Sequence, residues 1–326
     1  MALVYFDISQ FDIAQRVDNG VYLMKNNRFV EAIVEFDYVL RIDPRERWAR
    51  YNRMTSRLSL GDYSALAEHD CAWEIYDWGK PGSSGPSPVI QNLESLPVWC
   101  GERCNLLVWH NMGFGDAIMT LRFLSELVER CKNVTMVIRP ELVNLFQGYG
   151  ATVVSNVSDI SNFDARLTFF NSIFMMGHSL QTIPIDPYIK ANFNFTGGKM
   201  GIAWSGNSRM ELNIHSFLSR LDTHGFKLYA LQKGQVIDQV VSLECNDFKE
   251  TADLMMTLDH IVTVDTAAAH LACALGHPSV HLLLPFVMDW RWWNCDVWYP
   301  TIKTYRQETP DDWSIPFARL NAALKA

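Results

Sequence analysis

The chain has 326 residues, of which 48% are hydrophobic, 20% charged and 12% aromatic. This ordinary globular composition excludes a disordered, collagen-like or coiled-coil protein. The formal net charge of −8 argues against a nucleic-acid-binding protein, because such proteins carry a basic surface. At roughly 150 residues per domain, the length predicts two domains and a smaller additional segment.

The sequence gives no sign of export or of membrane insertion. Its apolar runs are shorter than the ~18 residues that a spanning helix needs, and the first residues lack the basic start of a signal peptide. Seven scattered cysteines are typical of reduced thiols rather than of a disulfide framework. Cys100 and Cys104 form the one close pair, without a second pair or a nearby histidine, so we expect no zinc site. The reduced thiols and the lack of a signal peptide together predict a cytoplasmic location.

Residues 1–79 are predicted to form paired helices. Apolar residues recur at three- and four-residue spacing over 21–40, Asn26-Asn27 interrupts them as a turn, and Asp43-Pro44 ends the second helix. A second helix pair is expected over 45–78, with its turn at residues 61–62.

The period of about 34 residues resembles the tetratricopeptide repeat. The matching residues are Gly20, Ala32, Phe36 and Pro44. The alternative is a plain helical hairpin. Because two repeats are fewer than a free-standing solenoid needs, we expect the segment to dock on the next domain.

Residues 80–98 are rich in Gly, Pro and Ser and are predicted to be a linker. Beyond them, short apolar segments alternate with helical ones in two blocks, 99–197 and 198–310, before an amphipathic helix over 311–326. The predicted strands cover residues 105–109, 134–138, 152–154, 166–170, 200–204, 227–231, 260–264 and 280–284; the predicted helices between them cover 116–132, 250–257 and 266–276.

This alternation predicts the α/β class, with two Rossmann-like parallel-sheet domains facing a cleft. In open parallel sheets, ligands bind beyond the carboxyl ends of the strands. The cleft between the two domains is therefore the expected site.

The most distinct motif is HIVTVDTAAAHLACALGHP at 260–278. A strand ends there, and Asp265 or Thr266 is placed to cap a helix that begins with Ala267 and other small residues. Small side chains let a phosphate approach the first amide groups of the helix, whose dipole favours an anion. His270 lies four residues beyond Thr266 on the same face. The alternative is a well-capped helix packed on the sheet.

A second motif, HNMGFGDA at 110–117, follows the first strand. Gly113 and Gly115 allow a tight turn, and Asn111 lies in the same loop. Asp116 is either a helix-capping residue or a carboxylate aimed into the cleft as a general base.

Two more predicted strands end in polar or small residues. Trp204-Ser205-Gly206-Asn207 follows one strand and Leu231-Gln232-Lys233-Gly234 follows the next. A lysine at such a position can reach a diphosphate as a point charge; the alternative is a solvated surface lysine.

Residues 285–300, PFVMDWRWWNCDVWYP, contain four Trp and one Tyr. Arg291 among these aromatics is placed to stack or to clamp a phosphate. The alternative is an aromatic plug in the seam between domains.

Taken together and in this order, these motifs resemble the tetratricopeptide-containing glycosyltransferases related to the heptosyltransferases (family 9). The resemblance covers the chain from about residue 99 to its end. It implies a GT-B fold and an inverting transferase that needs no metal and no cofactor besides its nucleotide-sugar co-substrate. The acceptor is then a hydroxyl of a glycan, a lipid-linked saccharide or a protein.

The resemblance also implies residue roles. Asp116 is the expected base, and Asn111, Gly113 and Gly115 form the glycine loop of the acceptor domain. The expected donor-binding residues are Trp204, Gly206, Asn207, Gln232, Lys233, Asp265, Thr266, Ala267, His270 and Arg291.

Three other functions compete with this one. The first is a partner-binding protein whose transferase site is vestigial, with the helical repeats recruiting the partner. The second is a transferase acting on modified nucleic acid, which the net charge of −8 disfavours. The third is a nucleotide-binding epimerase of the same fold.

Overall fold

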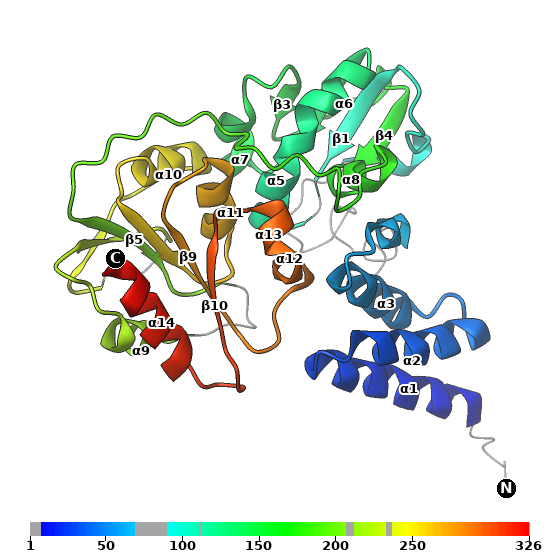
Figure 1. The fold of residues 1–326 in the computed structure, drawn as a ribbon. Coiled ribbons are helices and arrows are strands. Elements are labelled where there is room, and N and C mark those ends of the chain that lie inside the picture. The colour runs from blue at the N-terminus through cyan, green and yellow to red at the C-terminus, as the bar shows by residue number, and fades with distance from the viewer. Residues whose placement is uncertain (1–7, 69–89, 111, 207–211, 233–236, 326) are drawn as a thin grey trace, which may run out of the picture.

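The computed structural model describes residues 8–68, 90–110, 112–206, 212–232 and 237–325. They form an N-terminal helical segment and two lobes, each built on a parallel sheet (Figure 1). None of the helices formed by these residues is both long and apolar enough to cross a bilayer.

The helical segment contains α1 (Ile8–Lys25), α2 (Phe29–Ile42) and α3 (Arg47–Ser59). The predicted turn is confirmed, because Asn27 has a left-handed φ of 59° between α1 and α2. Helices α1 and α2 approach so closely that a Cβ on Gly20 would lie 2.4 Å from Cε1 of Phe36.

The second predicted helix pair begins as expected with α3 but continues differently after the turn. After α3 the chain turns through Gly61, at a φ of 82°, into a 3-10 helix, η1 (Tyr63–Glu68), where an α-helix was expected. Asp62 accepts hydrogen bonds from the Ser64 amide and hydroxyl, which holds this tight turn. The rest of the predicted pair, from residue 69, lies outside the described residues.

The first lobe has a four-stranded sheet in the order β3-β2-β1-β4, with all pairs parallel. Its strands are β1 (Asn105–Trp109), β2 (Asn133–Val137), β3 (Thr152–Val154) and β4 (Ala165–Thr168). The helix predicted over 116–132 is divided into α5 (Phe114–Thr120), η3 (Leu121–Phe123) and α6 (Leu124–Arg130). Short elements complete the lobe: η2 (Leu93–Ser95), α7 (Pro140–Val143), η4 (Asn144–Phe146), η5 (Phe169–Asn171) and α8 (Ser172–Met175).

The end of the predicted linker differs from expectation. Ile90 and Leu93 are buried against Leu107, Trp109 and Val137 of the first sheet. Burial of these apolar side chains makes this part of the chain one wall of the lobe rather than a solvated connection.

The second lobe has a six-stranded parallel sheet in the order β10-β9-β8-β5-β6-β7. Its strands are β5 (Lys199–Ala203), β6 (Lys227–Ala230), β7 (Val240–Ser242), β8 (His260–Thr263), β9 (Val280–Leu284) and β10 (Lys303–Arg306). Its helices are α9 (Ile214–Arg220), α10 (Phe248–Met255), α11 (Ala267–Ala274), α12 (Trp290–Trp293), α13 (Cys295–Trp298) and α14 (Ser314–Leu324).

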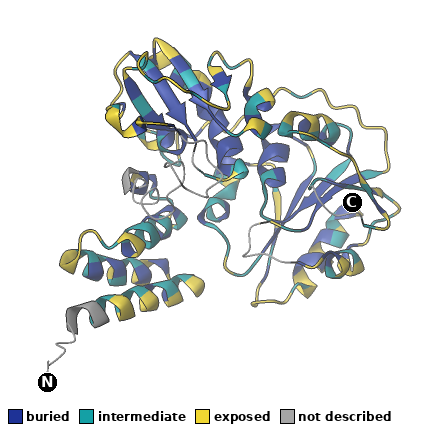
Figure 2. Cartoon of the chain, turned by 180° about the vertical axis from the view of Figure 1, so that it is seen from behind, coloured by how far each residue is buried: buried dark blue, intermediate teal, exposed yellow. Residues whose placement is uncertain are grey.

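Helices cover both faces of this sheet, as the continuous apolar strands predict. On one face, Phe217 of α9 and Phe317 of α14 pack with Val262 and Leu283. On the other face, α10 and α11 share a core that continues into the first lobe, and the strands are the most buried layer in Figure 2.

The Trp-rich segment fills the seam between the helical segment and the lobes, which confirms its interpretation as an aromatic plug. The Trp298 indole Nε1 donates to the Tyr63 hydroxyl at 2.6 Å, and Trp293 packs edge-on against Phe29 at 5.3 Å between ring centroids. Helix α3 also lies beside α12 (Figure 1).

Candidate functional site

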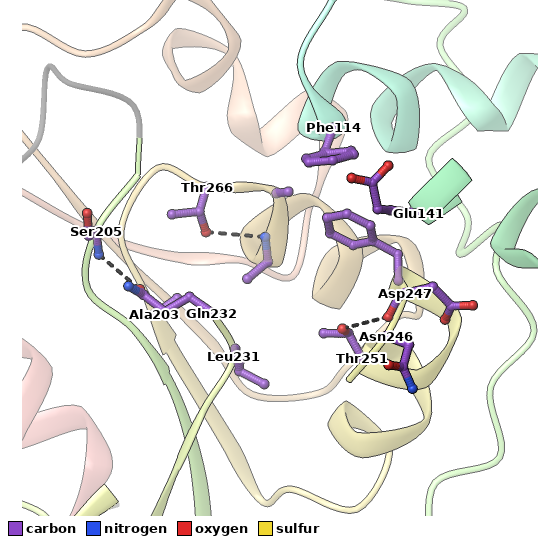
Figure 3. Close-up of a pocket in the computed structure, with 13 residues that line it drawn as sticks. Phe114, Glu141, Ala203, Ser205, Leu231, Gln232, Asn246, Asp247, Thr251 and Thr266 are labelled. Atoms are coloured by element: carbon purple, nitrogen blue, oxygen red, sulfur yellow. Dashed lines mark hydrogen bonds between the residues drawn. The ribbon is translucent and has the colours of Figure 1, made fainter. Parts of the chain in front are cut away.

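A cavity of about 270 Å³ opens at the carboxyl ends of β5, β6 and β8, where the topology predicts a ligand site. Phe114 and Glu141 enter from the first lobe and face residues of the second lobe across the cavity (Figure 3). We call it the donor cavity. Its lining residues are Phe114, Glu141, Ala203, Ser205, Leu231, Gln232, Asn246, Asp247, Phe248, Thr251, Thr266, Ala267 and Ala268.

The N-terminus of α11 forms one wall of the donor cavity. Thr266 caps this helix by accepting a hydrogen bond from the Ala268 amide at 3.2 Å, as the sequence predicts. Because Thr266, Ala267 and Ala268 all line the cavity, the positive end of the helix dipole meets it behind small side chains. Such a wall suits a phosphate or another anion.

Gln232 holds the ends of β5 and β6 together. Its side-chain Oε1 accepts hydrogen bonds from the amides of Trp204 at 2.9 Å and Ser205 at 3.1 Å. Trp204 itself is buried in the core of the second lobe and does not line the cavity, so its contribution is structural.

Gly206 supports the same wall by a close backbone approach. A Cβ at this position would lie 2.3 Å from the carbonyl oxygen of Asp265. A larger residue would therefore push apart the two strand ends that form the cavity.

Asp116 lies in a buried ion pair rather than at an open surface. Its carboxylate accepts hydrogen bonds from the Gly113 amide at 3.0 Å and from Nε of Arg291 at 2.7 Å, and it also contacts Nη2 of Arg291. Arg291 extends to Asp289 as well, with 2.5 Å between Nη1 and Oδ1. A buried guanidinium is stable only with such partners, which is why Arg291 lies here and not along the donor cavity.

The charges of this cluster act on one another. Burial raises the pKa of Asp116 and outweighs the opposing effect of Arg291. Burial alone would lower the pKa of Arg291, but Asp116 and Asp289 raise it. The arrangement keeps Arg291 charged while making Asp116 a better proton acceptor than an exposed aspartate.

Asp265 faces away from the donor cavity. It lines a second cavity that lies against the helical segment. Burial, reinforced by the neighbouring Asp289, raises the pKa of Asp265 to about 6. The sequence predicts Asp265 at a diphosphate, but Asp265 lines the second cavity, whereas the next residue, Thr266, lines the donor cavity.

His270 is packed between the lobes. Its Nδ1 is 2.8 Å from the Tyr299 hydroxyl, and its ring stacks on Trp292 at 4.6 Å. A Cβ on Gly115 would lie 2.6 Å from Cδ2 of His270, so Gly115 serves the close contact of α5 with α11. His270 does not line the donor cavity.

Asn111, Asn207 and Lys233, three of the expected site residues, lie outside the described residues. The chain just before Asn207 and just before Lys233 reaches the donor cavity, because Ser205 and Gln232 line it. Their expected roles remain predictions.

The contacts that close the donor cavity from the first lobe were not predicted from the sequence. Phe114 packs on Phe248 at 4.8 Å and beneath the Arg139 guanidinium at 3.5 Å. Asn144 Nδ2 donates to Asp247 Oδ2 at 2.6 Å. An aromatic residue between the two glycines of the 113–115 turn was the one visible signal.

The family model of glycosyltransferase family 9 (heptosyltransferase) matches residues 239–285. These residues include β7, α10, β8, α11 and β9, and thus the helix N-terminus that borders the donor cavity. The match supports a heptosyltransferase-like glycosyltransferase. No match to the chain is found among curated proteins.

Three solved structures are similar in part. The iron-containing dodecameric glycosyltransferase TibC of enterotoxigenic E. coli is 14% identical, with a TM-score of 0.42, over 59% of this chain and 60% of that one. The E. coli heptosyltransferase WaaC with ADP is 10% identical, with a TM-score of 0.41, over 68% and 98%. An O-GlcNAc transferase of Thermobaculum terrenum is 11% identical, with a TM-score of 0.27, over 96% and 79%. The match thus spans only 60% of the length of TibC.

Proposed function

We propose that the chain is a glycosyltransferase that moves a sugar from a nucleotide-sugar donor to an acceptor hydroxyl, by an inverting mechanism without a metal ion. The observation that carries the proposal is the donor cavity, which lies where the carboxyl ends of three parallel strands meet the N-terminus of α11. Of these elements, β8 and α11 belong to the stretch that matches family 9.

The donor's diphosphate would lie against Thr266, Ala267 and Ala268. During transfer the bond from the sugar's anomeric carbon to the diphosphate breaks, and negative charge grows on the leaving nucleoside diphosphate. The N-terminus of α11 would stabilise that charge, with Lys233 as a second cationic group. These two take the role that a divalent metal has in other transferases.

Asp116 is the proposed base. It would accept the proton of the acceptor hydroxyl as the hydroxyl oxygen bonds to the anomeric carbon from the face opposite the leaving group. Once protonated, Asp116 no longer balances the charge of Arg291. Asp289, already 2.5 Å from Arg291, would keep that cation paired throughout the reaction.

By the resemblance to the heptosyltransferase-related family, the two lobes would form a GT-B fold. The helical segment would be a short tetratricopeptide array that rests on the catalytic lobes. The enzyme would act in the cytoplasm on a glycan, a lipid-linked saccharide or a protein.

The test is a calorimetric titration with ADP, UDP, GDP and CDP, followed by an assay of nucleoside diphosphate release from the sugar form of whichever binds. Ala267→Glu places a carboxylate in the cavity wall and is expected to abolish binding. Ala318→Glu makes the same change on the exposed side of α14 and is expected to leave binding intact. Equal binding by both variants would refute the proposal.

A further inference from the structure

The donor cavity has two ends of opposite electrostatic character. At one end, Thr266, Ala267 and Ala268 bring the N-terminus of α11 to the lining. At the other end, the lining contains the carboxylates of Glu141, from α7 of the first lobe, and of Asp247, at the start of α10. We call these the helix end and the carboxylate end (Figure 3).

This asymmetry would orient a nucleoside diphosphate in the cavity. Carboxylates repel a phosphate, whereas the positive end of a helix dipole attracts it, so the diphosphate would lie at the helix end. The uncharged nucleobase would then lie at the carboxylate end. The side chains of Leu231 and Phe248 also line the cavity and offer apolar contact to the nucleobase ring.

Most of the polar side chains at the carboxylate end are engaged within the chain. Asp247 accepts hydrogen bonds from the Glu250 amide at 2.8 Å through Oδ1 and from Asn144 Nδ2 at 2.6 Å through Oδ2. The Asn246 side-chain amide donates to Oε2 of Glu250 at 3.1 Å. The Thr251 hydroxyl donates to the Asp247 carbonyl at 3.0 Å. Asp247, Asn246 and Thr251 are therefore held by the chain itself.

Glu141 differs from these residues, because only one of its carboxylate oxygens is engaged. Oε1 accepts a hydrogen bond from Nη2 of Arg139 at 3.2 Å, and Oε2 has no hydrogen-bond partner in the described part of the chain. The Arg139 guanidinium lies 3.5 Å from the centroid of the Phe114 ring, so the ion pair is braced against the cavity wall. The Glu141 side chain is 38% exposed, which leaves it open to a ligand.

Guanine is the nucleobase that matches a carboxylate best. Its N1–H and N2–H donors lie side by side, as those of a guanidinium do, and can bond to both oxygens of one carboxylate. Adenine and cytosine place a ring acceptor next to their amino group, and uracil places its N–H between two carbonyl oxygens. A carboxylate therefore repels part of the hydrogen-bonding edge of each of these three nucleobases.

We propose that the carboxylate end is a nucleobase subsite, in which Glu141 accepts hydrogen bonds from N1–H and N2–H of guanine, and that the donor is a guanosine diphosphate sugar. This inference rests on the proposed function. It makes the first lobe part of the donor site, because Glu141 and Phe114 come from that lobe.

The test is calorimetry of the full chain with GDP, ADP, CDP, UDP and inosine diphosphate (IDP), whose nucleobase is guanine without the 2-amino group. GDP is expected to bind at least about tenfold more tightly than the other four, because a hydrogen bond to a charged group contributes this much. Glu141→Gln is expected to reduce the ratio of GDP to IDP affinity to below about threefold. Glu129→Gln, at an exposed glutamate of α6 outside the lining, is expected to keep the ratio of the unmodified chain.

The ratio of GDP to IDP affinity separates recognition from a structural effect, because a structural effect weakens both nucleotides alike. Equal binding of GDP and IDP by the unmodified chain, tighter binding of ADP, CDP or UDP, or an unchanged ratio in Glu141→Gln would overturn the nucleobase assignment while the proposed function stands. If none of the five nucleotides binds, the proposed function fails, and the nucleobase assignment fails with it.

Discussion

The Nε atom of Arg291 lies 2.7 Å from Oδ1 of Asp116, although 175 positions separate the two residues in the sequence. The pair joins α5 of the first lobe to α12 beyond the second sheet. It therefore fixes the proposed base relative to the two cavities and ties the catalytic geometry to the contact between the lobes.

Asp116→Asn is expected to lower turnover by about 10²–10⁴-fold, the usual contribution of a general base, because the amide cannot accept the proton. Nucleotide affinity should change less than twofold, since Asp116 does not line the donor cavity. Steady-state kinetics and calorimetry check the two parts. Asp186→Asn, at an exposed aspartate, is the control. Full turnover by Asp116→Asn would show that Asp116 is not the base.

Arg291→Met is expected to destabilise the protein by about 3–5 kcal/mol, because it leaves buried carboxylates without their cation. The control is Arg319→Met, which removes an exposed arginine paired with Glu308 and should cost at most ~1 kcal/mol. Urea unfolding measures both. Equal losses would mean that the buried cluster does not depend on Arg291.

Tyr63→Phe is expected to lower stability by about 1–3 kcal/mol, since it leaves the buried Trp298 indole N–H without its acceptor. The loss would fall on the contact between the helical segment and the lobes, so limited proteolysis should cut the helical segment faster. Tyr22→Phe, at a tyrosine that is 61% exposed, is the matched control. Unchanged proteolysis in Tyr63→Phe would show that this hydrogen bond does not hold the segment.

A network of histidines at the amino ends of β8 and β9 predicts acid sensitivity. Ser279 Oγ lies 2.8 Å from His260 Nδ1 and 2.9 Å from His281 Nε2, and His281 Nδ1 lies 2.8 Å from the Tyr305 hydroxyl. Burial lowers the pKa of His260 and lowers that of His281 to about 3.

These histidines bind protons more readily in the unfolded chain than in the folded one. Their contribution to the free energy of unfolding is therefore complete above about pH 6.5 and is lost progressively as the pH drops toward 3. The slope is up to ~1.4 kcal/mol per pH unit for each histidine. Urea unfolding between pH 7.5 and 4.5 measures it. His281→Gln should flatten the profile and His215→Gln, at an exposed histidine, should not. A flat profile in the unmodified chain would contradict the prediction.

Removal of divalent metal by EDTA is expected to leave turnover unchanged, because α11 and Lys233 are proposed to stabilise the leaving group. The measurement is nucleoside diphosphate release with and without EDTA. Loss of activity that Mg²⁺ or Mn²⁺ restores would show that a metal takes part.

Local pattern predicted the central strands of both sheets well and missed the edges of the second sheet. The predicted strands over 105–109 and 280–284 coincide with β1 and β9, since buried central strands are short apolar runs. Strands β7 and β10 were missed: each lies at an edge of its sheet, where one-sided burial leaves a mixed sequence such as Lys303–Arg306.

The candidate site was predictable where it depends on neighbours in the chain and not where it depends on tertiary contacts. The Thr266 cap is a local feature and was predicted. The pairing of Asp116 with Arg291 and the burial of His270 against Tyr299 arise only when distant segments meet. No local pattern indicates that Arg291 pairs with the carboxylates of Asp116 and Asp289 rather than binding a phosphate in the cleft.

The most direct test of the central claim is calorimetry of the unmodified chain and Ala267→Glu with nucleoside diphosphates. If the N-terminus of α11 is a diphosphate site, at least one of the four binds the unmodified chain in a 1:1 ratio, and Ala267→Glu abolishes that binding. Absence of binding by all four, or undiminished binding by Ala267→Glu, would contradict the account.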